Sequence, residues 1–173
     1  MIFVTVGTNP TMAFDRLVRA MDELAGELDE PVVLQRGCAS YLPQHAESFA
    51  FTTGEHIEEL MLNARVIVSH AAAGAIIMAL QQNKPLVIVP RRFHLGEHVD
   101  DHQLQLAQAL AGQRRAVTVY EPSPASLRVA IEEAPKLTAA VPQGATLAAY
   151  LRRRLDSWRV QPARRRPLWL LKV

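Results

Sequence analysis

The sequence predicts an α/β domain with a doubly wound parallel sheet, and two patterns support this prediction. Short apolar, β-branched runs alternate along the chain with segments in which apolar residues recur every three or four positions. Each run ends at a glycine or a polar residue before the helical spacing begins. Strands that alternate with helices in this way form a parallel sheet with helices on both faces. A chain of 173 residues is long enough for one buried core.

Local signals place the individual elements. Strands are expected at 2–6, 32–35, 48–53, 66–68, 86–89 and 117–120. Asn9 and Pro10 predict the start of a first helix that continues to about residue 28, and Gly54 leads into a short second helix. Further helices are expected after the SHAAAG and GEHVDDHQ segments, at 123–134, where Pro135 should end the helix, and at 143–158. The sequence therefore predicts one Rossmann-like domain over residues 1–158 and a separate tail over 159–173.

Composition argues against a membrane-spanning or secreted protein. No apolar run approaches the ~20 residues that a membrane span requires. The N-terminus, MIFVTVGTNP, lacks the basic segment of a secretory signal peptide. The single cysteine, Cys38, cannot form an intramolecular disulfide, which favours a cytoplasmic protein.

Charge is distributed unevenly along the chain. Residues 152–173 hold eight basic residues and one acidic residue, a net charge of +7, so residues 1–151 carry −5 of the total charge of +2. Within this tail Arg164, Arg165 and Arg166 are followed by Trp169, a combination that favours contact with an anionic membrane surface. A partner-docking segment and a tail without a function are the alternatives. Nucleic-acid binding is not expected, because the body is acidic and contains no nucleic-acid motif.

Two predicted strand-to-helix turns have the composition of phosphate-binding loops. Gly7, Thr8 and Asn9 follow the first strand, and the segment from Ser69 and His70 to Ala73 and Gly74 follows the strand at 66–68. Small residues let a ligand approach the backbone, and a helix N-terminus favours a negatively charged group. An alternative needs no ligand: the glycine would serve only the turn geometry, and the alanines would serve only tight packing of the helix on the sheet. His70 taken alone is more typical of a structural histidine than of a catalytic one.

A third polar cluster follows the strand at 86–89. It contains Arg91, Arg92, His98, Asp101, His102 and Gln103. Two guanidinium groups at a strand end are suited to phosphate or carboxylate oxygens, and the polar groups near a helix start are suited to sugar hydroxyls. His98 and His102 are four residues apart and could share a helix face, which leaves a metal site open, although no third ligand is fixed by spacing. A solvated helix start is the remaining alternative.

The segments VTVGT, VIVSHAAAG and KPLVIVPRRFHLGEHVDDHQ together resemble the C-terminal, donor-binding domain of family 28 glycosyltransferases, the group that contains the peptidoglycan enzyme MurG. The resemblance covers about residues 2–134, and VPRR with GEHVDDHQ is its most specific part. The chain is similar in particular to the small subunits of split enzymes of this type. These are the PssE/EpsE-like proteins of exopolysaccharide synthesis and the soluble half of the eukaryotic dolichol-linked N-acetylglucosaminyltransferase.

The resemblance implies roles for several residues. Gly7 and Thr8 would lie near the nucleotide diphosphate, Ser69, His70 and Gly74 would line the donor cleft, and His102 and Gln103 would face the donor sugar. The chain departs from the family at Met78, where many relatives have a glutamate that holds the nucleotide ribose. Methionine cannot accept that pair of hydrogen bonds, so ribose recognition must differ or be weaker. The glycine and serine common at Ala72 and Ala73 are also replaced.

The resemblance further implies one half of a GT-B enzyme, the half that binds a UDP-sugar donor. The expected protein is the donor-binding subunit of a metal-independent, inverting hexosyltransferase without a cofactor, with UDP-glucuronate or UDP-glucose as donor. A membrane-associated partner would bind a polyprenyl-diphosphate-linked acceptor and supply the catalytic base at the inner face of the cytoplasmic membrane. Two other functions stay open: a non-catalytic scaffold subunit, which Met78 favours, and a metal-dependent hydrolase built on His98 and His102.

Overall fold

Six parallel strands form the centre of the protein, in the spatial order β3-β2-β1-β4-β5-β6. The computed structural model describes residues 1–139. The strands are β1 (Ile2–Thr5), β2 (Val32–Gln35), β3 (Glu47–Phe49), β4 (Val66–Ser69), β5 (Leu86–Ile88) and β6 (Val117–Thr118). This is the strand order of the dinucleotide-binding folds, so the predicted doubly wound parallel sheet is confirmed.

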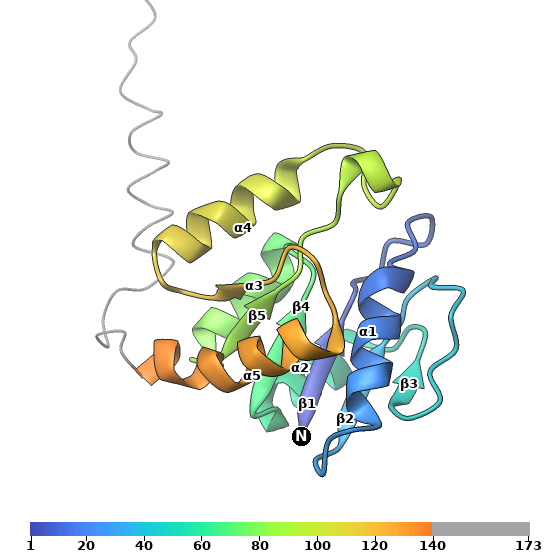
Figure 1. Ribbon diagram of the computed structural model, residues 1–173, viewed down its shortest axis with the longest axis horizontal. Helices are drawn as coiled ribbons and strands as arrows, with labels where there is room; N and C mark the ends of the chain where they lie inside the picture. Colours follow the sequence, from blue (N-terminus) through green and yellow to red (C-terminus); the bar gives the residue numbers. More distant parts are fainter. Residues whose placement is uncertain (140–173) are drawn as a thin grey trace, which may run out of the picture. The chain divides into compact units, whose positions relative to one another are not determined.

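Helices cover both faces of the sheet. They are α1 (Asp15–Ala25), α2 (Gly54–Asn63), α3 (Ala73–Gln81), the short 3₁₀-helix η1 (Phe93–Leu95), α4 (His102–Gly112) and α5 (Pro124–Ala139). Helices α1 and α5 pack on one face, in front of the sheet in Figure 1, and α2, α3 and α4 contribute to the core on the opposite face. Two hydrophobic layers therefore enclose the sheet.

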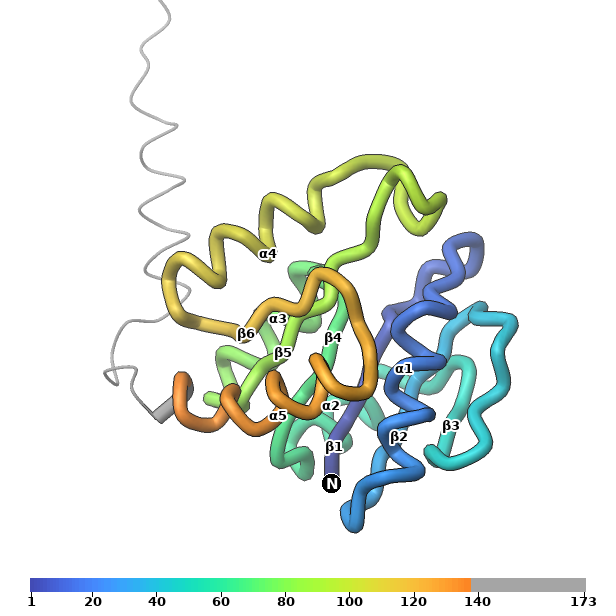
Figure 2. Tube along the Cα trace, viewed as in Figure 1, coloured from blue at the N-terminus to red at the C-terminus, as the bar shows by residue number. Residues whose placement is uncertain are grey.

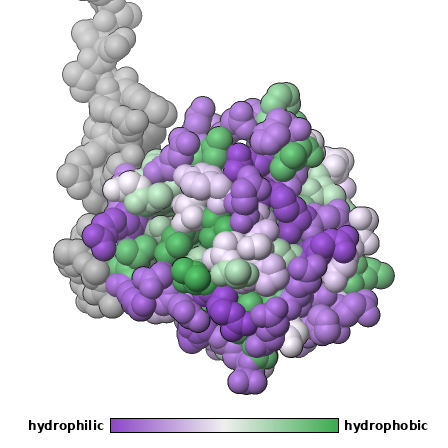
Figure 3. Space-filling model, in the orientation of Figure 1, coloured by the Kyte–Doolittle hydropathy of each residue, from purple (hydrophilic) through white to green (hydrophobic). Residues whose placement is uncertain are grey.

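Alternation along the strands explains the two layers. In β1, Ile2 and Val4 belong to the core under α1 and α5, whereas Phe3 belongs to the other core. All three side chains are fully buried, as expected for a central strand that has helices on both faces. The face of the molecule in Figure 3 is mainly hydrophilic, with scattered hydrophobic areas.

The predicted boundaries differ from the observed ones at several elements, and three differences have a clear structural cause. Helix α1 begins at Asp15 rather than at Pro10, because the Asn9 side chain accepts hydrogen bonds from the amide and hydroxyl of Thr11 and closes a local turn. Strand β3 ends at Phe49, because Thr53 caps α2 instead of extending the strand. Helix α5 continues through Pro135 to Ala139, since the buried residues of its inner face pack against the core despite the missing amide hydrogen.

The predicted helix at 143–158 and the tail at 159–173, with Arg164, Arg165, Arg166 and Trp169, lie outside the described residues. Within residues 1–139, no helix is both long enough and apolar enough to span a membrane.

Asp22 on α1 is fully buried and organises the loop between β2 and β3. Its carboxylate accepts hydrogen bonds from the amides of Gln44, His45 and Ala46 and from the Tyr41 hydroxyl, all at 2.8–2.9 Å. Burial alone would raise the pKa of this carboxyl group, but the four hydrogen bonds outweigh burial and hold the pKa of Asp22 below its ordinary value of 3.8. The fold therefore requires the charged form.

Asp22→Asn is expected to destabilise the fold by roughly 2–4 kcal/mol, because an amide cannot accept all four hydrogen bonds. Since the folded pKa is lowered, the stabilisation from Asp22 is present above the unfolded pKa and is lost as the pH falls through the folded value. We therefore expect urea unfolding from pH 7 to about pH 3 to show that the difference in unfolding free energy between variant and wild type shrinks below about pH 4. Asn substitution of the exposed Asp29 is the control. A difference that is constant across this range would contradict the assignment.

Candidate functional site

A pocket lies at the carboxyl ends of β1, β4 and β5, beside the point where the strand order reverses between β1 and β4. Ligands bind at this position in open α/β sheets. The cavity has a volume of about 260 Å³. It is lined by Val6, Thr8, Asn9 and Met12 in and after β1, by His70 and Ala72 after β4, and by Arg91, His98 and Gln103 after β5. Figure 2 shows that the segments after β1 and β5 approach each other at the same end of the sheet.

Arg91 is buried between these two segments and is only 2% exposed. Its Nη1 donates to the carbonyl oxygens of Met12, Ala13 and Glu97 at 2.8, 3.0 and 3.2 Å, and its Nη2 donates to the carbonyl oxygen of Val6 at 2.8 Å. The guanidinium group therefore brings positive charge to the pocket while most of its hydrogen-bond donors serve the protein itself. Burial lowers the pKa of Arg91, but a guanidinium stays charged at neutral pH.

The two arginines of the predicted pair face different surroundings. Arg92 does not line the pocket: its Nη2 donates to Glu121 Oε1 at 2.8 Å and to the Tyr120 carbonyl oxygen at 3.3 Å. The structure therefore does not bring Arg91 and Arg92 together around one ligand, as the sequence had suggested. The strand end turns the two consecutive side chains in different directions.

Thr5 links the Gly7 turn to His70. The Thr5 hydroxyl accepts a hydrogen bond from the Gly7 amide at 3.2 Å and donates to Gln35 Oε1 at 2.5 Å. The Thr5 carbonyl oxygen accepts from the His70 amide at 3.2 Å and lies 3.3 Å from His70 Nδ1. Gly7 has a φ of +82°, and an added Cβ would lie only 2.5 Å from His70 Nε2. Glycine is thus required at position 7 by both conformation and contact.

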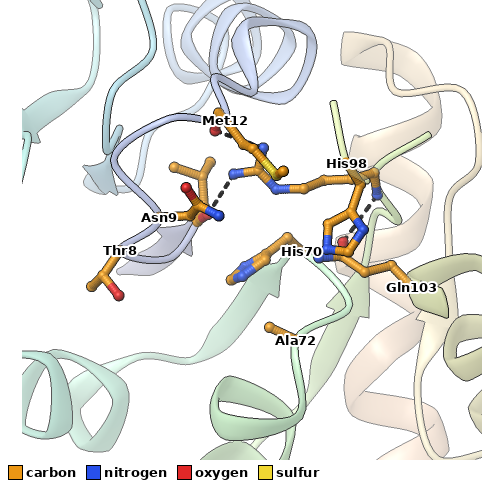
Figure 4. A pocket seen from close by; sticks show the side chains of 9 residues that line it. Thr8, Asn9, Met12, His70, Ala72, His98 and Gln103 are labelled. Carbon is orange, nitrogen blue, oxygen red and sulfur yellow. Dashed lines mark hydrogen bonds between the residues drawn. The ribbon is translucent and has the colours of Figure 1, made fainter. Parts of the chain in front are cut away.

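His70 presents a neutral imidazole to the pocket (Figure 4). Burial and the nearby charge of Arg91 lower its pKa to about 4, against the opposing effect of the Thr5 carbonyl. A carbonyl oxygen can only accept, so Nδ1 carries the proton and Nε2 retains its lone pair. A group with this pKa holds a proton too weakly to serve as an efficient general base at neutral pH.

The N-terminus of α3 provides free backbone donors next to the pocket. Ala72, at the N-cap of α3, lines the pocket, and no side chain caps this helix. Thr53 caps α2 and Ser123 caps α5, whereas α1 and α4, like α3, have no side-chain cap. Uncapped first-turn amides together with the helix dipole favour an anion.

The predicted residues around α3 lie at different depths. Ala73 and Gly74, in the first turn, are exposed. A Cβ added at Gly74 would meet no other atom within 4 Å, so the fold itself does not require glycine there. Ser69 is fully buried below the pocket and donates to the His70 carbonyl oxygen. Ser69, Ala73 and Gly74 are therefore near the pocket without lining it.

The GEHVDDHQ segment contributes two residues to the lining. His98 and Gln103 face the pocket, and Gln103 Oε1 accepts from the Arg91 amide at 3.1 Å. Asp101 and His102 are exposed at the start of α4 and do not line the pocket. His98 precedes the helix, so it shares no helix face with His102. In the part of the chain that the structure describes, no three His, Cys, Asp or Glu side chains are grouped to hold a metal ion, which leaves the hydrolase alternative without a supporting cluster.

Sequence reasoning missed several residues that shape this site. Val6, Met12 and Ala72 line the pocket, and Glu97 and Arg16 hold the loop after β5. Ala72 and Glu97 lie inside segments that the sequence had already singled out, so their positions carried a signal. The sequence contained no signal for Met12, whose main-chain carbonyl oxygen makes the contact with Arg91, or for Arg16, whose partner Glu97 is distant in sequence.

Comparisons with known proteins agree on one family and one fold. Residues 1–140 match the glycosyltransferase family 28 C-terminal domain. The UDP-N-acetylglucosamine transferase subunit ALG13 of Homo sapiens is 28% identical over 120 residues, which are 63% of this chain and 10% of the human protein. The mouse protein of the same name is 31% identical over 119 residues, 62% of this chain and 10% of that protein. The chain thus spans about a tenth of the length of these two relatives.

Solved structures of glycosyltransferases contain the same fold. The glycosyltransferase of kitacinnamycin aligns with a TM-score of 0.63 and 22% identity, over 90% of this chain and 39% of that one. MurG of Acinetobacter baumannii aligns with a TM-score of 0.59 and 16% identity, over 90% of this chain and 49% of that one. The fold of this chain therefore corresponds to 39% and 49% of these two larger chains.

Gly7→Ala is expected to cost roughly 2–4 kcal/mol of stability, because the new Cβ adds a clash with His70 to a left-handed backbone. Gly96→Ala is the matched control: Gly96 has a φ of +70° but open space around its Cβ, so it tests the backbone strain alone. Chemical denaturation should show a larger loss of unfolding free energy for Gly7→Ala than for Gly96→Ala. When His70 is already replaced by alanine, Gly7→Ala should cost no more than Gly96→Ala does. Equal losses at both glycines would refute the contact.

Arg91→Met is expected to destabilise the protein by roughly 3–5 kcal/mol, because four carbonyl oxygens lose their donor, two of them in buried hydrogen bonds. The neighbouring Arg92→Met serves as the control and should cost about 1 kcal/mol or less, since its ion-pair partner Glu121 is largely exposed. Urea unfolding measures both variants. Similar losses for the two would show that the carbonyl contacts of Arg91 do not hold the pocket loops.

Proposed function

Because the chain belongs to glycosyltransferase family 28, whose C-terminal domain it matches over residues 1–140, we propose that it binds the nucleotide-sugar donor of a two-component glycosyltransferase. The observation that carries this proposal is the pocket at the reversal of strand order, with the uncapped N-terminus of α3 at its edge. The first-turn amides of α3 are suited to a diphosphate. The buried charge of Arg91 adds a favourable field for the same anion.

The proposed donor is a UDP-sugar. Support comes from the relatives, which are named as subunits of a UDP-N-acetylglucosamine transferase. A UDP-glucuronate donor would need an arginine free to bind its carboxylate, and it has less support because Arg91 binds main-chain carbonyls and Arg92 binds Glu121. UDP-glucose and UDP-N-acetylglucosamine are therefore the donors to test first, with UDP-glucuronate beside them.

In the proposed mechanism this chain holds the donor and stabilises the leaving UDP. The amides of α3 and the Gly7 turn bind the diphosphate, Arg91 offsets negative charge through its field, and Gln103 and His98 face the bound donor. His70 is a weak candidate for the base, since its pKa of about 4 leaves it a poor proton acceptor. The base that deprotonates the acceptor hydroxyl is therefore assigned to a partner subunit.

We propose that this partner is membrane-associated and binds a polyprenyl-diphosphate-linked acceptor in exopolysaccharide synthesis, at the inner face of the cytoplasmic membrane. The resemblance to PssE/EpsE-like small subunits supports this assignment. The basic tail, with Arg164, Arg165, Arg166 and Trp169, has the composition of a segment that contacts the partner or an anionic membrane surface.

Titration calorimetry of the full chain with UDP, UMP and the three UDP-sugars tests the donor proposal. UDP is expected to bind about tenfold or more tightly than UMP, because the second phosphate contacts the α3 amides. Ala73→Glu should abolish this binding, since its carboxylate would occupy the anion position, while the helix dipole keeps the fold stable. Ala125→Glu, an exposed position in the first turn of α5, is the matched control and should bind UDP normally.

Two other results would redirect the proposal. Absence of UDP binding, both with and without the partner, would favour the scaffold alternative, in which Met78 marks a donor site that has been lost. Transfer of sugar to a lipid acceptor at a normal rate by the purified chain alone would exclude the need for a partner.

A further inference from the structure

An ion pair outside the pocket joins α1 to the loop after β5. Arg16 Nε donates to Glu97 Oε1 and Arg16 Nη2 donates to Glu97 Oε2, both at 2.9 Å. Two parallel hydrogen bonds of this kind fix orientation as well as distance. The two residues are 81 positions apart in sequence, so the pair fastens one segment of the fold to another.

Both partners of this ion pair have further contacts. Arg16 also donates to the carbonyl oxygens of Tyr120 at 2.9 Å and of Pro90 at 3.2 Å. Glu97 Oε2 also accepts from the Arg92 amide at 2.9 Å. The pair therefore holds both ends of the segment from 90 to 97, and it ties this segment to the turn before α5.

Burial distinguishes this pair from the surface pairs of the protein. The side chains of Arg16 and Glu97 are 20% and 10% exposed, whereas those of Arg128 and Glu27 are 38% and 56% exposed. Exposed pairs contribute little to stability or order. A mostly covered, two-point pair with both carboxylate oxygens engaged is more costly to break, because the remaining partner would lose its nearest opposite charge in a partly desolvated position.

The loop that this pair holds has few apolar anchors of its own. Phe93 is 56% exposed and Leu95 is 50% exposed, so these side chains do not fix the loop to the core. Polar contacts do so instead: Arg91 binds the Glu97 carbonyl oxygen from the pocket side, and Arg16 binds the Glu97 side chain from the α1 side. The next residue, His98, lines the pocket.

We propose that Arg16 and Glu97 are positioning residues that hold the wall of the pocket in its binding geometry before a ligand arrives. The inference rests on the proposed donor function and adds a role for two residues that do not line the pocket. Without the ion pair, the loop would have to become ordered when the ligand binds. The apparent Kd would then equal the intrinsic Kd divided by the fraction of molecules whose loop is already in the binding geometry.

Calorimetric titration of UDP into the full chain tests this role. Arg16→Met and Glu97→Gln are each expected to raise the Kd about tenfold, and the double variant should raise it no further than the more severe single variant, because one interaction has been broken. Arg128→Met, which breaks an exposed pair, should leave the Kd unchanged. Leu127→Ala, at a buried position on α5 that belongs neither to the ion pair nor to the pocket lining, supplies a variant that loses stability and should also bind UDP normally.

The measurements are made where circular dichroism shows each variant to be folded. If Arg16→Met fails to fold, Glu97→Gln and the milder Arg16→Lys take its place. The Kd of Arg16→Lys for UDP is expected to lie between that of the wild type and that of Glu97→Gln. If these variants bind UDP with the same Kd as the wild-type chain, the positioning role is overturned and the donor function is not affected. A wild-type chain that binds no UDP would instead refute the donor function on which the inference rests. An equal loss of affinity in Leu127→Ala would show that stability, rather than loop position, controls binding.

Discussion

Arg91 occupies the space between two of the loops that line the pocket, those after β1 and β5, and burying its charge determines how these two loops lie. An isolated guanidinium is costly to bury unless its donors are satisfied. Here the compensation comes from carbonyl oxygens of Val6, Met12, Ala13 and Glu97, which belong to both loops. These oxygens can converge on one side chain only if the loops adopt a single arrangement. The pocket is therefore a consequence of solvating one buried cation with main-chain dipoles.

This arrangement separates charge from hydrogen bonding in the site. Arg91 supplies a positive field, but its Nη1 and Nη2 donors are directed at the protein, so a bound anion must find its hydrogen bonds elsewhere. The uncapped first turn of α3 offers them. The same charge, together with burial, keeps His70 neutral. One residue thus influences the shape of the pocket, its electrostatic potential and the protonation of its histidine.

The sequence predicted the sheet and the end of the sheet at which the pocket lies, because both depend on local patterns. The β-branched runs specify buried strands, and the segments that follow parallel strands meet at one edge of the sheet. The roles of individual residues were harder to predict. Arg91 binds carbonyl oxygens, which every residue possesses, and Arg16 binds Glu97 across 81 positions, so neither contact leaves a pattern in the sequence. Asn9 was misread as a helix cap because its side chain forms a turn of the same chemistry.

The groups that this chain offers at the pocket indicate which step of the proposed reaction it performs. Binding a diphosphate requires preorganised donors and positive charge, and the described residues supply both, from the first turn of α3 and from the buried Arg91. Deprotonating an acceptor hydroxyl requires a base with a pKa close to the working pH. Burial, and then the same cation that favours the donor, hold the pKa of His70 far below that range. A site built around Arg91 is thus suited to the donor and poorly suited to the base, which is a physical reason to place the two functions on separate subunits.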